Sequence, residues 1–494
     1  MKNTPEGRAS LIFARDVRVS QGARTVLRYA PALAAGLALR LWMLKEIFYS
    51  SGDTLVYGGL ARNMLRHGVY AFATVHGVLR PTLIRLPGYP LFLALCFRLF
   101  GMENDAAVVY VQIVLELLGC VLLAEFARRV APPALSRAAA LGTLWLAALC
   151  PFTASYSIAL LTETPTLFAL ALAMWAMARF RDLPGTSPAG SGLQGGGPGW
   201  ANALWFTFAV VFAALLRPDG ALIAVAFAPA LVMGWPAKAV PRRRLARMVL
   251  AGVLLALAPF AAWTWRNWRV FHVLQPLAPR YANDPDESSY PGWQRWYKTW
   301  SLDFASTYQI YWNVPGEPFD VNDLPSRAFD SPAQRAETIA LAADYRRDHN
   351  DLSPAVDARF ARLAQERIRA HPLRYYLWLP LGRLMDMVFR PRVENLPVAT
   401  RWWAYSRHPF DTCFSWAYAA LNVFYLLLGI AGLCLRPRVW APLLAYVVLR
   451  CALLLTIGAP ETRYTLEFFP ILFVWGGIAA AAAVGKLRAA VTRR

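Results

Sequence analysis

The chain has 494 residues, of which 57% are hydrophobic and 16% are charged. Soluble domains carry about 25% charged residues, so this composition excludes a disordered chain, a coiled coil and an ordinary soluble enzyme. The net charge of +21 is the one feature that suggests nucleic-acid binding, and its distribution along the chain argues against that function.

Nearly all of the excess positive charge lies in six short stretches between apolar runs. They hold 22 of the 51 Lys and Arg residues but only 3 of the 30 Asp and Glu residues. This is the positive-inside pattern of a membrane protein. We therefore assign these stretches to the cytoplasmic side: 1–28, 126–137, 179–200, 236–247, 436–438 and 486–494.

A membrane-spanning helix needs about 20 mostly apolar residues. Ten candidates alternate with the basic stretches, at 29–48, 106–125, 137–154, 160–178, 201–217, 219–235, 248–265, 416–435, 439–458 and 467–485. With the N-terminus inside, ten crossings put every basic stretch and the C-terminus on the cytoplasmic side. The sequence thus predicts an all-α polytopic membrane protein with both termini in the cytoplasm.

This topology divides the chain into four segments. A basic leader covers 1–28, and a first membrane module of seven spans covers 29–265, including an outer loop at 50–104. Residues 266–415 form an outer domain, with 17 acidic and 19 basic residues. The last segment, 416–494, holds three spans and a basic tail.

Both outer segments show helical signals. The first outer loop opens with one face of a helix, made by Asp53, Tyr57, Leu60 and Met64. Residues 91–96 are apolar but too short to span, so an interfacial or re-entrant helix is expected there. In the outer domain, Ser-Pro pairs at 331–332 and 353–354 predict helix starts, and 373–389 predicts an amphipathic helix lying on the membrane.

A tryptophan-rich segment of the outer domain has two interpretations. Its aromatic residues could stack on sugar faces, or they could form a helix face packed on the membrane. The second is favoured. The residues are Trp293, Trp296, Tyr297 and Trp300.

Several charged residues fall at outer-face turns that are far apart in sequence. Each has a simple structural explanation: Asp53 is an acid at a helix start, Glu163 is a turn acid near water, and the arginines are membrane-boundary residues. Together they place two carboxylates and several arginines on one face of the membrane. That combination is typical of a site for an anionic head group with an acid nearby.

On these residues the chain resembles the GT-C glycosyltransferases, polytopic enzymes that take a sugar from a polyprenyl-phosphate carrier. The likeness is greatest to the bacterial relatives of protein O-mannosyltransferases and of the lipid A aminoarabinose transferase. The matching stretches occur in the family's order, at 52–70, 85–101, 161–166, 216–220, 259–271 and 461–470. The ordered set indicates fold and reaction type rather than substrate.

The resemblance also implies roles for individual residues. Asp53 matches the catalytic aspartate, and Glu163 matches an acid that approaches the same site. Donor phosphate or carrier binding is implied for Arg85, Arg266, Arg463 and Tyr464, and substrate contacts for Tyr57, Tyr89, Arg217, Asn267 and Glu461. Many relatives have a second acid after the aspartate, whereas this chain has Thr54, so neither a divalent metal nor another cofactor is expected. Relatives often have Lys-Pro-Pro where this chain has Arg85-Leu86-Pro87.

The implied activity is transfer of a hexose or pentose from a polyprenyl-phosphate donor, such as undecaprenyl phosphate sugar, with inversion. The acceptor hydroxyl would belong to a lipid, a glycan or a protein on the periplasmic side of a bacterial inner membrane, as in modification of lipopolysaccharide or cell-envelope glycan. Two alternatives remain. One is a ligase or polymerase that uses a diphosphate-linked glycan. The other is a transporter, which charged residues in or near spans keep open: Arg40, Lys45, Glu116 and Arg450.

Overall fold

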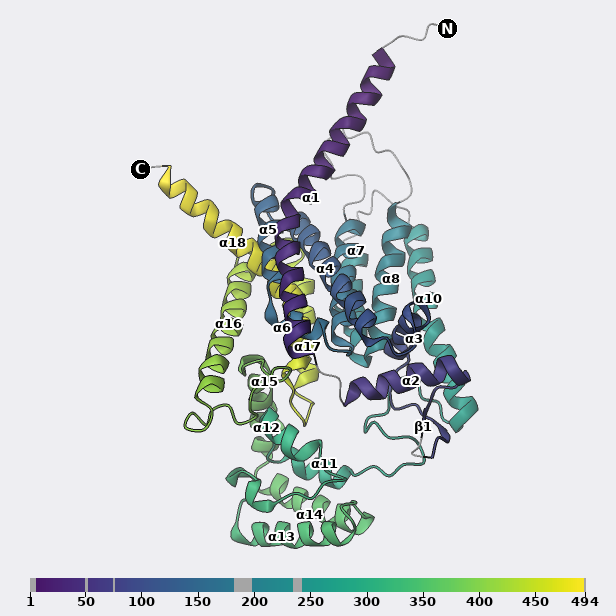
Figure 1. The fold of residues 1–494 in the computed structure, drawn as a ribbon, viewed down its shortest axis with the longest axis vertical. Helices are drawn as coiled ribbons and strands as arrows, with labels where there is room; N and C mark the ends of the chain where they lie inside the picture. Colours follow the sequence, from purple (N-terminus) through teal and green to yellow (C-terminus); the bar gives the residue numbers. More distant parts are fainter. Residues whose placement is uncertain (1–5, 49–51, 74–75, 182–197, 234–241, 493–494) are drawn as a thin grey trace.

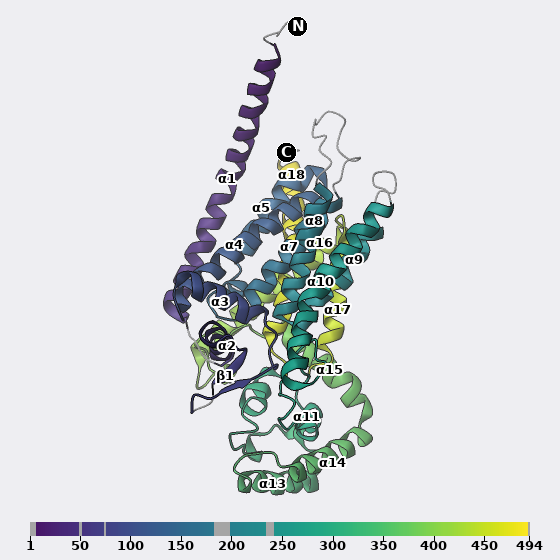
Figure 2. The same cartoon turned by 90° about the vertical axis from the view of Figure 1, so that its right-hand side faces the viewer.

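The computed structural model describes residues 6–48, 52–73, 76–181, 198–233 and 242–492. A helical bundle is joined at one end to a smaller helical domain, and both chain ends lie at the opposite end of the bundle (Figures 1 and 2). The predicted cytoplasmic stretches fall partly outside the described residues, at 1–5, 182–197, 236–241 and 493–494.

Helices of the bundle cover each of the ten predicted spans. The bundle contains α1 (Glu6–Ile47), α4 (Asp105–Val130), α5 (Ser136–Ala148), α6 (Pro151–Ser157), α7 (Glu163–Arg181), α8 (Pro198–Leu216), α9 (Leu222–Met233), α10 (Arg242–Phe271), α16 (Pro409–Cys434), α17 (Trp440–Leu454) and α18 (Phe469–Val491). Three short 3-10 helices connect them: η1 (Pro133–Leu135), η2 (Pro218–Ala221) and η7 (Thr462–Phe468). The predicted boundary at residue 28 is not a structural break, because α1 runs through it.

The chain is a multi-pass membrane protein. Among the described residues, five helices are long and apolar enough to cross a membrane, at Asp105–Val130, Gly199–Leu216, Arg243–Phe271, Pro409–Cys434 and Thr462–Val491. A sixth crossing results if α5 and α6, which meet at an angle of 56°, form one broken span. The total of ten crossings stays a prediction.

Small residues allow the bundle helices to pack closely. A Cβ on Gly142 of α5 would lie 3.1 Å from the carbonyl oxygen of Gly477 in α18. Such contacts are typical of helix interfaces in membranes. These two helices form one of the largest contacts of the bundle.

The buried charges of α1 and α4 are explained by this packing. Arg40 Nε lies 2.5 Å from Glu116 Oε2, and both side chains are buried. Arg40 also donates hydrogen bonds to the carbonyl oxygens of Gly36 and Ala148. The pair therefore ties α1 to α4 and α5, and gives these two residues a structural role.

The first outer loop is folded against the end of the bundle. It contains α2 (Asp53–His67), an antiparallel pair of short strands β1 (Ala71–Ala73) and β2 (Leu79–Pro81), and α3 (Gly88–Phe100). The predicted helix face at the start of the loop and the predicted short apolar helix are both present. Leu60, at the centre of that face, is fully buried.

The outer domain confirms both predicted helix starts. α13 (Pro332–Arg347) begins after Ser331, whose hydroxyl accepts a hydrogen bond from the backbone of Gln334, and α14 (Pro354–Ala370) begins after Ser353. The remaining elements are α11 (Pro291–Lys298), α12 (Phe304–Ser306), η3 (Thr307–Tyr311), η4 (Val321–Asp323), η5 (Ser326–Ala328), η6 (Arg374–Trp378) and α15 (Leu379–Phe389). η6 and α15 together cover the predicted amphipathic helix, and Tyr376, Trp378 and Met385 on it are exposed.

The tryptophan-rich segment requires a correction. Trp293, Trp296, Tyr297 and Trp300 are at most 2% exposed and form the core of the outer domain with α13 and α14. The favoured prediction, a helix face packed on the membrane, is wrong, and these rings are also too buried to stack on a sugar. An apolar helix face has the same sequence period whether it packs on lipid or on protein.

Candidate functional site

Asp53 lies where the bundle meets the first outer loop. It is the first residue of α2, and the preceding Gly52 has a φ of 55°, a left-handed conformation that favours glycine. Gly52 thus forms the turn that directly precedes α2. A carboxylate in the first turn of a helix is stabilised by the helix dipole.

Two arginines from distant parts of the chain hold the Asp53 carboxylate. Arg85 Nη2 lies 2.9 Å from Oδ1, while Arg463 Nη1 and Nη2 both lie 3.4 Å from Oδ2. Burial favours the neutral carboxyl, but the guanidinium groups of Arg463 and Arg85 outweigh it, so the pKa of Asp53 is below its usual value. Asp53 is therefore ionised at neutral pH.

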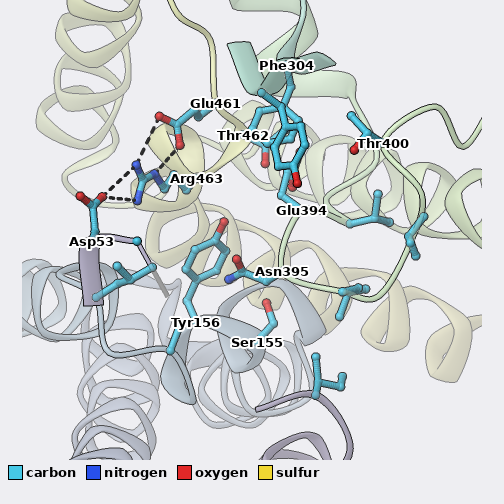
Figure 3. A pocket seen from close by; sticks show the side chains of 18 of the residues that line it. Asp53, Ser155, Tyr156, Phe304, Glu394, Asn395, Thr400, Glu461, Thr462 and Arg463 are labelled. Carbon is cyan, nitrogen blue, oxygen red and sulfur yellow. Dashed lines mark hydrogen bonds and ion pairs between the residues drawn. The ribbon is translucent and has the colours of Figure 1, made fainter. Parts of the chain in front are cut away.

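Arg463 connects Asp53 to a second acid. Its Nε lies 2.6 Å from Glu461 Oε2, and the Tyr464 hydroxyl donates a hydrogen bond of 2.5 Å to Glu461 Oε1. Figure 3 shows the Arg463 guanidinium between the carboxylates of Asp53 and Glu461. Residues predicted near the two ends of the sequence thus meet at one site: Asp53 lies in the first outer loop, and Glu461, Arg463 and Tyr464 lie before the last helix.

Behind Arg463 lies a buried set of ion pairs that reaches into the bundle. Glu163 Oε1 lies 3.1 Å from Arg217 Nη1 and 3.9 Å from Arg463 Nε. Arg217 Nε lies 3.3 Å from Asp219, which in turn accepts a hydrogen bond of 2.7 Å from Arg450. Glu163 is only 2% exposed and does not line the cavity. It therefore contacts Arg463 on the side away from the cavity.

This buried network ends at an acid that the sequence did not single out. Glu467 Oε2 lies 2.8 Å from Arg450 Nη2, and both side chains are buried. The two residues lie on η7 and α17, inside apolar runs. The sequence did carry a signal for Glu467. It is a charged residue in a run expected to span a membrane, where such residues need a partner.

The site opens into a cavity of about 1090 Å³ between the end of the bundle and the outer domain. One side is lined by Asp53, Arg85, Glu461, Arg463 and Tyr464. The opposite side, which sequence reasoning missed, is lined by residues of the α15–α16 connection and of the outer domain, including Phe304, Tyr308, Trp312, Arg390, Glu394, Asn395, Thr400 and Trp402.

Three residues predicted at the site lie elsewhere. Arg266 donates hydrogen bonds of 2.7 Å to the carbonyl oxygens of Thr82 and Tyr70, and does not line the cavity. It fastens the first outer loop to α10. Asn267 is buried and donates to the Gln275 carbonyl oxygen.

Tyr89 is the third of these residues. It is fully buried on α3, and its hydroxyl donates a hydrogen bond of 2.8 Å to Gln112. Tyr57 packs edge-on against the Tyr89 ring at 5.1 Å. Since Tyr57 shares the Asp53 side of α2, it lies beside the site without lining the cavity.

A metal centre is not apparent in the described parts of the chain, which bring together no group of three or more His, Cys, Asp or Glu side chains suited to a metal ion. The two acids nearest to Arg463, Asp53 and Glu461, are separated by its guanidinium (Figure 3). Independence from metal stays a prediction.

No family model and no curated protein matches the chain. Among solved structures, it is similar to the oligosaccharyltransferase of Archaeoglobus fulgidus tethered with an acceptor peptide, at 14% identity and a TM-score of 0.49, over 94% of this chain and 50% of that chain. It is also similar to ArnT from Cupriavidus metallidurans bound to undecaprenyl phosphate, at 15% identity and a TM-score of 0.38, over 93% and 78% of the two chains.

Both are GT-C glycosyltransferases. They belong to the class that the sequence resemblance names. The chain spans about half the length of the oligosaccharyltransferase. The likeness is one of chain arrangement, and the function proposed below rests on the residues of this chain.

Proposed function

We propose that the protein is a membrane glycosyltransferase that moves a sugar from a polyprenyl-phosphate donor to an acceptor hydroxyl, with inversion. The observation that carries the proposal is that Asp53 shares two arginines, Arg85 and Arg463, at the edge of a large cavity. A phosphate at this edge would compete with Asp53 for the same guanidinium groups. Arginine binds phosphate oxygens in the same paired geometry as carboxylate oxygens.

The shared arginines suit this reaction because negative charge moves between their two partners. The acceptor O–H gives its proton to Asp53, the acceptor oxygen forms a bond to the anomeric carbon, and the bond from that carbon to the phosphate oxygen breaks. Asp53 thus loses a negative charge while the leaving phosphate gains one. Arg85 and Arg463 stabilise both distributions without moving far, which is the preorganisation that lowers a barrier.

The low pKa of Asp53 beside its two arginines fits this role. While both guanidinium groups face the carboxylate, it is a weak base. When a phosphate takes over part of their charge, the pKa of Asp53 rises and its basicity increases. The acid thereby becomes an effective general base only after the donor has bound.

The carrier would enter from the membrane side, with its phosphate at the outer end of the bundle and its tail among the helices. By the distribution of basic residues, this end would face the periplasm of a bacterial inner membrane, with both termini cytoplasmic. Undecaprenyl phosphate is the carrier class expected there. A lipid, a glycan or a protein of the cell envelope would supply the acceptor hydroxyl.

The test is release of polyprenyl phosphate. Protein in lipid nanodiscs would receive a panel of polyprenyl-phosphate sugars and an envelope extract as acceptor, beside an Asp53→Asn variant. Loss of a general base should reduce release by about 10²–10⁴-fold. Asp348→Asn, which changes an exposed acid of the outer domain, is the matched control and should behave like wild type.

The alternatives are tested by two further assays, one with diphosphate-linked glycans as donors and one with the protein in sealed vesicles. Release of a diphosphate carrier from a diphosphate-linked glycan, with no release from any monophosphate donor, would establish the ligase or polymerase instead. Movement of a solute into sealed vesicles, with no carrier product, would support transport.

A further inference from the structure

The cavity has a second polar side that the proposed chemistry does not use. Four residues of the connection between α15 and α16, together called the loop wall, line it: Arg390, Glu394, Asn395 and Thr400. In the view of Figure 3, Glu394 and Thr400 lie on the side of the pocket away from Asp53, and Asn395 and Tyr156 lie between. The loop wall therefore faces the space into which an acceptor must bring its hydroxyl.

The loop wall is firmly attached to the element that carries Arg463. Arg392 is buried and donates hydrogen bonds of 2.8 Å to the carbonyl oxygen of Thr462, 2.6 Å to Thr465 Oγ1 and 3.1 Å to Asn422 Oδ1. Thr462 and Thr465 belong to η7, and Asn422 to α16. This anchor fixes the position of the loop wall relative to the phosphate-binding side, as a preformed site requires.

Polar atoms of the loop wall lack partners within the described part of the chain. Arg390 Nε, Glu394 Oε1 and Asn395 Nδ2 are buried without a hydrogen bond. The nearest approach is between Arg390 Nε and Glu394 Oε1, at 3.9 Å, and these side chains are 8% and 10% exposed. Since buried polar groups are normally paired, a ligand with several hydroxyl groups would complete them after small adjustments.

Aromatic rings complete the same end of the cavity. Phe304, Trp312 and Trp402 line it, and the Arg390 guanidinium lies over the Phe304 ring at 5.6 Å. Phe304 and Trp312 meet edge to face, with centroids 5.6 Å apart. Flat rings beside carboxylate and amide groups offer a sugar both an apolar face and hydrogen bonds.

The charge of the loop wall argues against a phosphorylated acceptor. Arg390 lies between two acids, 3.6 Å from Asp386 and 3.9 Å from Glu394. Arg392 donates its hydrogen bonds within the fold, to Asn422, Thr462 and Thr465. Two guanidinium groups thus face two carboxylates, and neither arginine is left free to bind an anion. A phosphate placed there would have to compete with these carboxylates for Arg390.

We propose that the loop wall is the acceptor site and that the acceptor is a neutral glycan, one hydroxyl of which is directed toward Asp53. This inference rests on the proposed transferase function. Glu394 and Asn395 bind hydroxyl groups of the acceptor sugar, while Phe304 and Trp402 contact its ring. The two substrates thus occupy opposite sides of one cavity, with Asp53 between them.

Binding is the test, because it can be measured whether or not transfer occurs. Wild type in nanodiscs would be given three probe fractions: dephosphorylated, protein-free envelope oligosaccharides, tryptic peptides of envelope proteins, and lipid A. Saturation-transfer NMR would measure the binding of each fraction. We expect saturable binding of the oligosaccharides, weakened at least tenfold in Glu394→Gln and in Asn395→Ala.

Two controls separate this inference from the proposed function. Glu366→Gln removes an exposed acid outside the cavity and should bind like wild type, whereas Asp53→Asn should keep oligosaccharide binding although it loses transfer. Thermal unfolding curves that match wild type would show that each variant is folded. If Glu394→Gln fails that check, Asn395→Ala carries the test.

The outcomes are distinct. Oligosaccharide binding that depends on the loop wall supports the acceptor site even if no donor is turned over, and in that case only the proposed transfer fails. Binding of peptides or lipid A in place of oligosaccharides overturns the inference. Oligosaccharide binding that is unchanged in both loop-wall variants overturns it as well, whatever the transfer assay shows.

Discussion

Arg463 places both of its terminal nitrogens 3.4 Å from the same carboxylate oxygen of Asp53, although 410 residues separate the two in sequence. The pair joins the first outer loop to the turn before the last helix. Because Arg463 also contacts Glu461 and Glu163, its guanidinium serves three acids at once. A bound phosphate would therefore redistribute charge over the whole group rather than meet a free arginine.

Substitutions at Asp53 and Arg85 should affect different kinetic constants. In the proposed mechanism Asp53→Asn removes the general base, and we expect kcat to fall by about 10²–10⁴-fold. Arg85→Ala would remove a proposed charged hydrogen bond to the donor phosphate, worth roughly 1.5–3 kcal/mol. That loss corresponds to about a 10- to 150-fold increase in donor KM. Steady-state kinetics on polyprenyl-phosphate release would separate the two effects.

Arg80→Ala is the matched control for that comparison. Arg80 lies on the same outer loop but is half-exposed and pairs with Asp286, so both constants should stay at their wild-type values. Full turnover by Asp53→Asn would reduce Asp53 to an acid at a helix start.

Glu163 should act through Arg463 rather than on the substrate. It is buried behind Arg463 and does not line the cavity. Glu163→Gln should therefore lower kcat by about tenfold, the low end of the range for loss of one charged hydrogen bond. With Glu163 neutralised, Arg463 should lower the pKa of Asp53 further. The acid limb of the kcat/KM profile should therefore move to lower pH, a shift that a general loss of stability would not produce.

Replacement of Trp296 should lower the stability of the outer domain, whereas replacement of Trp312 should weaken acceptor binding. Trp296 is fully buried, and its ring lies 5.0 Å from Phe360 and 5.1 Å from Trp293. Trp296→Ala should destabilise the outer domain by about 3–5 kcal/mol, visible as faster limited proteolysis. Trp312 is 48% exposed and lines the cavity, so Trp312→Ala should leave proteolysis unchanged and weaken acceptor binding.

Asp386 should make stability fall as the pH rises. Burial raises its pKa from 3.8 to about 6, against the opposing effect of Arg390. The folded state therefore binds more protons than the unfolded state between these values, so the stabilising contribution is complete below pH 3.8 and is lost as the pH passes 6. The difference corresponds to about 3 kcal/mol.

Asp386→Asn tests this dependence, because an amide keeps the acceptor for the backbone N–H of Phe304 without a charge. Its unfolding temperature relative to wild type should be lowest near pH 4 and should increase until about pH 7. Asp348→Asn, at an exposed position, should show no such trend. A constant difference at all pH values would contradict the raised pKa.

Local signals in the sequence predicted the helices and several residues that the fold brings together. The charge pattern gave the expected sides of the membrane, the Ser-Pro pairs marked the starts of α13 and α14, and Asp53 was placed at a helix start. Asp53, Arg85 and Arg463 meet as the resemblance implied. Each of these features depends on residues that are near one another in sequence or on a known motif.

The features that the sequence did not predict depend on contacts between distant segments. Arg266 looked like the other outer arginines, and only the folded first loop shows that backbone carbonyl groups occupy it. The loop wall has no helical or strand periodicity, so the sequence did not indicate which of its side chains share a face. The role of Glu467 follows from its ion pair with Arg450, which lies on another helix.

The anchoring of Asp53 by Arg463 has a consequence for synthesis in the cell. Ribosomes add about 5–20 residues per second, so roughly 20–80 seconds pass between the emergence of these two residues. During that interval Arg85 has been made but Arg463 has not, so only one of the two arginines that contact Asp53 in the folded protein is available. η7 is also not yet made, so Arg392 lacks its partners Thr462 and Thr465. For the proposed transferase, this order of synthesis means that donor turnover has to wait until the final helix is inserted.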